Sequence, residues 1–271
     1  MSLIDVRLRY LAQGLTWPVY WRDVKSIAGC VAGERHRVDV LGAAGIGKTT
    51  FIGALAHALG ERVPRLEKLN PVSAEWAEAF HSLYSTHLRM MADDSLGWEM
   101  RHSKTLHLSQ VVDLEQRILR SSRQQIVING VGIIRHRLAH FSKMAKAQPD
   151  FVAHLLSDRV FINCASRDPV ARAVGGKRSR GDQDAYDENV TSAVSRKVEK
   201  VSRGVDAIRD IGVPVLDLDM DRPRKENIAL VADFLGQYGM ISRAIDAQSR
   251  KASRYFATDD SWAPLGSGGQ R

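Results

Sequence analysis

The chain has 271 residues, of which 44% are hydrophobic and 26% are charged. This balance is typical of a globular protein with room for one sizeable α/β domain. No apolar run approaches the ~20 residues that a membrane-spanning helix needs, and the N-terminus lacks the pattern of a secretory signal. The formal net charge of +8 favours anionic partners such as nucleotides or nucleic acid.

The two cysteines, Cys30 and Cys164, are too few and too far apart in sequence to indicate a disulfide framework or a metal site. We expect both to be reduced thiols in a cytoplasmic protein.

Residues 1–36 are predicted to form a helical arm ahead of the main domain. Leu3, Val6 and Tyr10 share one face of a helix, and Pro18 interrupts this pattern. We interpret the arm as a segment that packs on the main domain, with a partner-binding arm as the alternative.

The main domain is predicted to cover residues 37–257. Residues 38–41 form an apolar run of strand type, a glycine-rich loop follows, and residues 51–59 read as a helix that Gly60 ends. Residues 61–125 then form a mostly helical insertion. In it, Ser73 is suited to cap a helix whose inner face carries Trp76, Phe80, Leu83 and His87.

A second helix of the insertion is expected near residues 109–122, with Val112 and Leu119 on an apolar side and Glu115 on a polar side. Further strands are expected at residues 125–129, 160–164 and 215–219, and a fifth strand at 63–69. A long helix at 190–208 and a closing helix at 227–238 separate and follow them, and residues 258–271 form a flexible tail. Alternating strands and helices predict a parallel β-sheet with helices on both faces.

The glycine-rich loop carries the strongest functional signal. Its residues match the pattern G-x-x-x-x-G-K-[ST] between a strand and a helix, which is the context of a P-loop. Glycines let backbone N–H groups approach a phosphate closely, and the following helix directs its positive end to it. We therefore predict binding of ATP with Mg²⁺ by Gly42, Ala43, Ala44, Gly45, Ile46, Gly47, Lys48, Thr49 and Thr50.

In this loop Lys48 is expected to reach the β- and γ-phosphates, and the Thr49 hydroxyl to coordinate Mg²⁺. A P-loop protein usually places an aspartate at the end of a second strand, but here that position holds Asn129. The amide can hold a metal-bound water without contributing charge. The alternatives are Asp217 and Asp219, at the end of the last strand.

The order of these motifs resembles the P-loop kinases of small molecules and nucleotides, the adenylate and thymidylate kinase-like group. The resemblance covers roughly residues 37–236. It rests on the P-loop, on Ile126-Val127-Ile128-Asn129-Gly130-Val131-Gly132-Ile133-Ile134-Arg135, and on a strand followed by Asp168-Pro169-Val170-Ala171-Arg172 and Lys177-Arg178-Ser179-Arg180. Asn129 stands where the group has an aspartate.

The resemblance implies that residues 166–182 form a basic lid. Arg172, Arg178 and Arg180 would then close over the triphosphate and neutralise the transferring phosphoryl group. Arg135 would contact a phosphate or the acceptor. A solvated basic loop, or a loop that contacts nucleic acid, remains the alternative.

In such kinases the acceptor is held by the insertion, which here is rich in polar and aromatic side chains suited to a sugar or aromatic acceptor. The residues are His81, Tyr84, His87, Arg89, Trp98, Arg101 and His102. They also have a simpler interpretation as core or surface residues.

The favoured function is a kinase that transfers the γ-phosphoryl group of ATP to a small molecule. A regulatory NTPase or nucleotide-dependent binding module, acting on a protein or nucleic-acid partner, is the alternative. A nucleotide-binding protein with little catalysis, of sulfotransferase-like type, is the least favoured because the loop keeps an intact Gly47-Lys48-Thr49.

Overall fold

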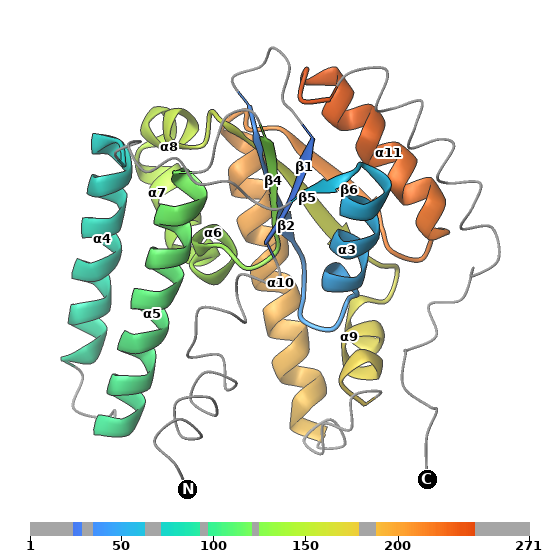
Figure 1. The fold of residues 1–271 in the computed structure, drawn as a ribbon. Helices are drawn as coiled ribbons and strands as arrows, with labels where there is room; N and C mark the ends of the chain where they lie inside the picture. The colour runs from blue at the N-terminus through green and yellow to red at the C-terminus, as the bar shows by residue number, and fades with distance from the viewer. Residues whose placement is uncertain are drawn as a thin grey trace, which may run out of the picture.

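The computed structural model of the chain describes residues 24–28, 35–62, 72–92, 97–120, 125–178 and 188–241. A six-stranded sheet of order β3-β1-β4-β2-β5-β6 runs through them (Figure 1). The strands are β1 (Val24–Ala28), β2 (Arg37–Leu41), β3 (Glu61–Arg62), β4 (Gln125–Asn129), β5 (Arg159–Ala165) and β6 (Val215–Asp219).

The four strands predicted most clearly are present and parallel. β2 pairs in parallel with β4 and β5, and β5 pairs in parallel with β6. The predicted all-parallel sheet was nevertheless wrong at one edge, because β1 runs antiparallel to both β4 and β3.

β1 also corrects the predicted helical arm. Residues 24–28 belong to that arm, yet they form a strand whose register with β4 runs from Val24 opposite Asn129 to Ala28 opposite Gln125. Pairing with β4 on one side and β3 on the other decides the conformation, a long-range effect that local periodicity does not reveal. Residues 1–23, the strand predicted at 63–69 and the tail at 258–271 lie outside the described residues.

Helices cover both faces of the sheet, as predicted. Side chains alternate along β2, so that Val38 and Val40 pack on one face while Leu41 packs on the other. The first face is covered by α3 (Lys48–Ala58) and α11 (Arg224–Gln237) (Figure 1). The second face is covered by α4 (Ala74–Met91), α5 (Trp98–Leu119), α6 (Ile133–His136), α7 (Leu138–Ala147), α8 (Pro149–Leu155) and α10 (Glu188–Asp210). The remaining helix is α9 (Pro169–Arg178).

The insertion is helical, as expected, although α5 begins at Trp98 rather than near residue 109. The N-cap of α4 is Ser73, whose hydroxyl accepts a hydrogen bond from the backbone N–H of Trp76, as the sequence predicts. The predicted inner face of α4, which includes Phe80 and Leu83, is buried in the core. The two helices therefore pack on the second face of the sheet and do not form a separate unit.

The strand order creates a topological switch point between β2 and β5. After β2 the chain forms β3 and β4 on one side of that strand, whereas β5 and β6 lie on its other side. In open α/β sheets, ligands bind beyond the carboxyl ends of the strands at such a point. Among the helices that the structure describes, none is both long and apolar enough to cross a membrane.

Candidate functional site

The loop of residues 42–49 connects β2 to α3 at this switch point. Gly42, Gly45 and Gly47 have φ angles of 131°, 89° and 102°, in the region that side-chain-bearing residues rarely adopt. Gly47 is also the N-cap of α3, and the first turn of α3 has neither a side-chain cap nor an acidic residue. The positive end of the α3 dipole is therefore not neutralised from within that turn.

Lys48 lies within the curve of the loop. Its ammonium Nζ donates hydrogen bonds to the carbonyl oxygens of Gly42, at 2.8 Å, and Ala43, at 2.5 Å. The side chain is buried, whereas the neighbouring Thr49 and Thr50 are exposed. The ammonium and the positive end of α3 lie at the same loop, and both attract an anion.

The loop packs against the end of β5 and against α9. A Cβ atom added to Gly42 would lie 2.6 Å from the carbonyl oxygen of Cys164, and one added to Gly45 would lie 2.6 Å from that of Ala173. Only glycine fits these contacts as they stand. Helix α9 in turn packs on α10 through Ala173 and Val194, so α9 lies between the loop and α10.

Lys48 and Arg172 converge near Cys164. Burial raises the pKa of the Cys164 thiol to about 12, and both cations act on this thiol in the opposite direction. The structure thus brings together two residues that the sequence places more than a hundred positions apart. The side chain of Arg178 and the whole of Arg180 lie outside the described residues, so those two predicted lid arginines stay predictions.

Arg172 forms an ion pair with Asp221, a residue that sequence reasoning missed. The Asp221 carboxylate also accepts a hydrogen bond from the backbone N–H of Arg167, at 2.8 Å. This bond is the main reason that the pKa of Asp221 is lowered, and the Arg172 guanidinium adds to the effect. Asp221 lies two residues beyond Asp219, just after the carboxyl end of β6. This position in the sequence could have indicated that Asp221 is a site residue.

Asn129, predicted as a metal ligand, is engaged within the chain. Its Nδ2 donates to the carboxylate of Asp39 at 3.2 Å, and its Oδ1 accepts from the backbone N–H of Val131 at 2.9 Å. Both polar atoms of the amide therefore already have protein partners. Residues 24–28, 35–62, 72–92, 97–120, 125–178 and 188–241 contain no group of three or more histidine, cysteine, aspartate or glutamate side chains suited to hold a metal ion.

The two alternative acids are engaged as well. Asp217 pairs with Arg209 at 2.7 Å and accepts a hydrogen bond from Asn163 at 2.9 Å. The carboxylate of Asp219 accepts from the backbone N–H of Asp221, also at 2.9 Å. The bond from Asn163 joins the carboxyl ends of β5 and β6, and the pair with Arg209 joins β6 to α10.

A buried charge network lies beneath the loop, on the second face of the sheet. Arg159 donates to Asp39 at 2.8 Å and to Glu115, and the side chains of Arg159 and Glu115 are fully buried. The Arg159 guanidinium also lies 4.8 Å from the centre of the Trp76 ring. The second oxygen of Glu115 accepts from the backbone N–H of Ile133, at 3.1 Å.

The predicted polar side of the helix at Glu115 was therefore wrong, because Glu115 is buried in the core, where the arginine of β5 provides a charged partner. Burial raises the pKa of Asp39, and the nearby Arg159 opposes this rise. The network links β2, β5, α5 and α6, and Asn129 extends it to β4. We assign it a role in holding these elements together below the loop.

A second cationic cluster follows β4, where α6 meets α7. Arg137 lies close enough to four histidines to lower their pKa values, in each case after the larger effect of burial. The pKa of His136 falls to about 3, and its ring packs edge-on against that of His107 with 4.9 Å between centres. The other two histidines are His87 and His140. Arg135 also lowers the pKa of His136, Lys104 that of His87 and Lys143 that of His140, so at neutral pH several permanent cations lie close to uncharged imidazoles.

The residues predicted to bind the acceptor differ in burial and in their contacts. His87 is buried and its Nε2 lies 2.9 Å from the Thr105 hydroxyl, whereas Trp98 is 74% exposed. Arg135 donates to the carbonyl oxygen of Gly130 at 2.8 Å. His81, Arg89 and His102 are exposed, and Tyr84 and Arg101 are half-buried. Of the predicted set, His87 is the residue that joins the cluster around Arg137.

Comparison of the sequence with models of protein families and with curated proteins finds no match to either. A functional assignment therefore rests on the chemistry of the chain itself.

Proposed function

We propose that the chain binds ATP with Mg²⁺ through the 42–49 loop. The observation that carries the proposal is the loop itself: three glycines in the left-handed region, a buried lysine inside the curve, and a helix whose first turn carries no acid. This combination supplies converging N–H groups and a positive charge, the chemistry that a phosphate chain needs. A phosphate oxygen would replace the carbonyl oxygens to which Lys48 now donates.

Mg²⁺ would be held mainly by the nucleotide and by water. Thr49 fits as a protein ligand because its side chain is exposed at the first turn of α3. Asn129 donates to Asp39 and accepts from Val131, and the second lone pair of its amide oxygen would be the one to hold a metal-bound water. Mg²⁺ commonly keeps several waters and binds substrate phosphates. The ion supplies charge neutralisation between the phosphates, and Lys48 adds to that charge.

We further propose that the chain is a kinase that transfers the γ-phosphoryl group to a small molecule. Arg172 supports this reading because it shares the surroundings of Cys164 with Lys48, where a second cation can neutralise the transferring group. Its ion pair with Asp221 holds the guanidinium in place. The cluster around Arg137 follows the end of β4, next to β2 in the sheet, and suits an acceptor with an anionic group.

A phosphoryl-transfer assay tests the kinase proposal. ADP formation from ATP and Mg²⁺ would be measured alone and with panels of sugars, nucleosides and small acids. We expect slow release alone and a rise of at least tenfold with a suitable acceptor. Arg172→Ala should lower this accelerated rate more than it weakens ATP binding, with Arg120→Ala, an exposed arginine at the end of α5, as the control. Equal losses in ATP affinity and rate would assign Arg172 to binding alone.

The regulatory NTPase is favoured by one observation, the engaged amide at the end of β4. Without a carboxylate at that position the chain would contribute less charge to Mg²⁺, and a partner could then supply the groups that complete the site. Such a protein would hydrolyse ATP slowly without any small acceptor and would respond to a macromolecular partner. ADP release that no small acceptor accelerates, but that a partner does accelerate, would replace the kinase proposal with this one.

A further inference from the structure

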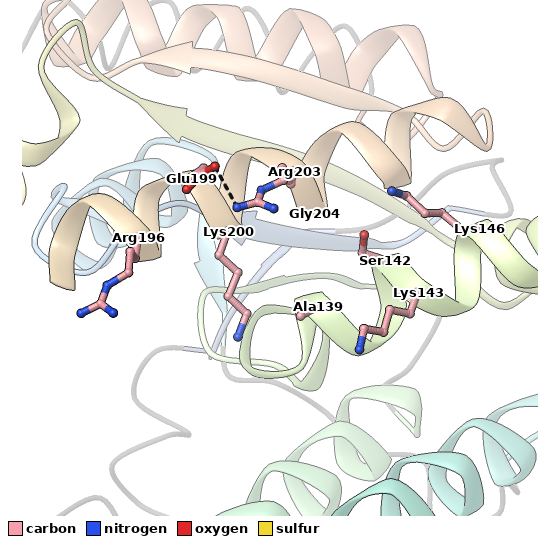
Figure 2. Close-up of a pocket in the computed structure, with 9 residues that line it drawn as sticks. All are labelled: Ala139, Ser142, Lys143, Lys146, Arg196, Glu199, Lys200, Arg203 and Gly204. Carbon is pink, nitrogen blue, oxygen red and sulfur yellow. Dashed lines mark ion pairs between the residues drawn. The ribbon is translucent and has the colours of Figure 1, made fainter. Parts of the chain in front are cut away.

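A groove of about 510 Å³ lies between α7 and α10, on the helix-covered second face of the sheet. Figure 2 shows side chains from both helices lining it. Its volume is within the range of ligand-binding pockets. It is lined by Ala139, Ser142, Lys143, Lys146, Arg196, Glu199, Lys200, Arg203 and Gly204.

The groove is strongly cationic. Five of its lining side chains are positive and one is negative, so it carries a formal +4, half of the net +8 of the whole chain. The single acid, Glu199, pairs with Arg203 at 2.8 Å across one helical turn of α10. Helix α7 contributes two lysines and contains no acidic residue. Charge of one sign is thus concentrated in a small concave area.

The cations form two rows along the helices. On α10, Arg196, Lys200 and Arg203 recur at helical spacing, and at ~1.5 Å per residue they span about 10 Å. On α7, Lys143 and Lys146 form the opposing row, as Figure 2 shows. Small residues lie between the rows, and the side chain of Leu138 occupies the position that a Cβ on Gly204 would need.

We propose that this groove binds the phosphodiester backbone of nucleic acid through charge and without reading the base sequence. A chain of regularly spaced phosphates matches two rows of cations better than one compact anion does. Among the described residues that line the groove, none is aromatic, so it offers no surface on which bases would stack. An anionic membrane fits less well because its surface is flat, whereas these cations line a concavity.

The binding would be independent of the proposed nucleotide site. None of the residues of the 42–49 loop lines the groove. The groove can therefore be altered without touching the loop, and urea unfolding of each variant reports whether it is still folded.

The test compares two double variants with the same change in net charge. Lys143→Ala with Lys200→Ala removes one cation from each row. Lys197→Ala with Arg120→Ala removes two exposed cations outside the groove. Fluorescence anisotropy would follow binding of labelled single-stranded and duplex oligonucleotides of about 20 nucleotides, a length that exceeds typical site sizes, over about 50 to 200 mM salt.

We expect the wild-type chain to bind and the groove variant to bind at least tenfold more weakly, with less than a twofold change in the control variant. The slope of log affinity against log salt should fall by roughly 0.7 per lost contact for a single strand, or roughly 0.9 for a duplex. Equal losses in both double variants would reduce the effect to general charge and overturn the proposal. So would the absence of wild-type binding, or binding to anionic phosphatidylserine vesicles in place of either oligonucleotide.

Discussion

The middle of β2 and the loop at its end use buried charge in opposite ways. In the middle, Asp39 meets Arg159, which also meets Glu115, so that each charge faces one of opposite sign. At the end, the Lys48 ammonium donates to neutral carbonyl oxygens of its own loop. Charge that is matched by charge holds the elements of a fold together. We propose that the Lys48 ammonium exchanges these carbonyl oxygens for the oxygens of a phosphate.

Removing one member of the charge network gives the largest expected effect. Arg159→Met would leave Asp39 and Glu115 buried without their cation, which typically costs about 3 to 5 kcal/mol. Urea unfolding would measure the loss of stability. Arg203→Met, which breaks the exposed pair with Glu199, is the matched control and should cost less than about 1 kcal/mol.

A triple variant sharpens this comparison. Replacing Asp39 and Glu115 by leucine together with Arg159→Met removes all three charges, and it should recover part of the stability because no buried charge then lacks a partner. If Arg159→Met cost as little as the exposed control, the network would not be the structural support that we describe.

The histidine cluster is expected to make stability depend on pH. The folded-state pKa of His136 is about 3, below its ordinary value of 6.5. The neutral form therefore contributes stability that is fully present above pH 6.5 and is lost as pH falls below it. At about 1.36 kcal/mol per pH unit, His136 should account for about 2 kcal/mol of the loss between pH 7 and pH 5.

His136→Gln should flatten the pH profile by that amount, as measured by urea unfolding at both pH values. His81→Gln, at an exposed position of α4, is the control and should keep the wild-type profile. An unchanged slope in His136→Gln would show that the imidazole is accessible to protons in the folded chain.

Three glycine substitutions give the smallest expected effects and separate backbone strain from packing. Gly60→Ala places a side chain at a φ of 79° with open space around it, and should cost about 1 kcal/mol. Gly45→Ala adds the overlap with Ala173 and should cost more. Gly53→Ala, in open space within α3, should stabilise by up to about 1 kcal/mol.

Calorimetric unfolding of the three variants would rank them, and titration with ATP would show whether Gly45→Ala alone weakens binding. Similar costs for Gly45→Ala and Gly60→Ala would mean that the contact between the loop and α9 is easily relieved.

The sequence predicted correctly those elements that are determined by residues close together in the chain. The strand, loop and helix around Lys48 and the Ser73 cap of α4 follow from short-range rules that tertiary contacts then reinforce. β1 was missed because its conformation depends on partners about a hundred residues away in β4. Glu115 was predicted on a polar side of its helix, but it is buried. Its burial depends on Arg159, which only the fold brings close to it.

In the candidate site, too, features set by local spacing could be predicted, whereas features set by contacts between distant segments could not. The 42–49 loop could be read from its spacing, but the pairing of Arg172 with Asp221 depends on how the ends of β5 and β6 meet. The engagement of Asn129 by Asp39 likewise depends on the register of β2 and β4.

The most direct test of the account is isothermal titration of the chain with ATP and with ADP, each with and without Mg²⁺, beside Lys48→Ala. We expect saturable ATP binding by the wild-type chain and loss of that binding in Lys48→Ala, with urea unfolding showing that both proteins are folded. Equal ATP affinity in the two proteins, or no binding to either, would contradict the assignment of the 42–49 loop as a nucleotide site.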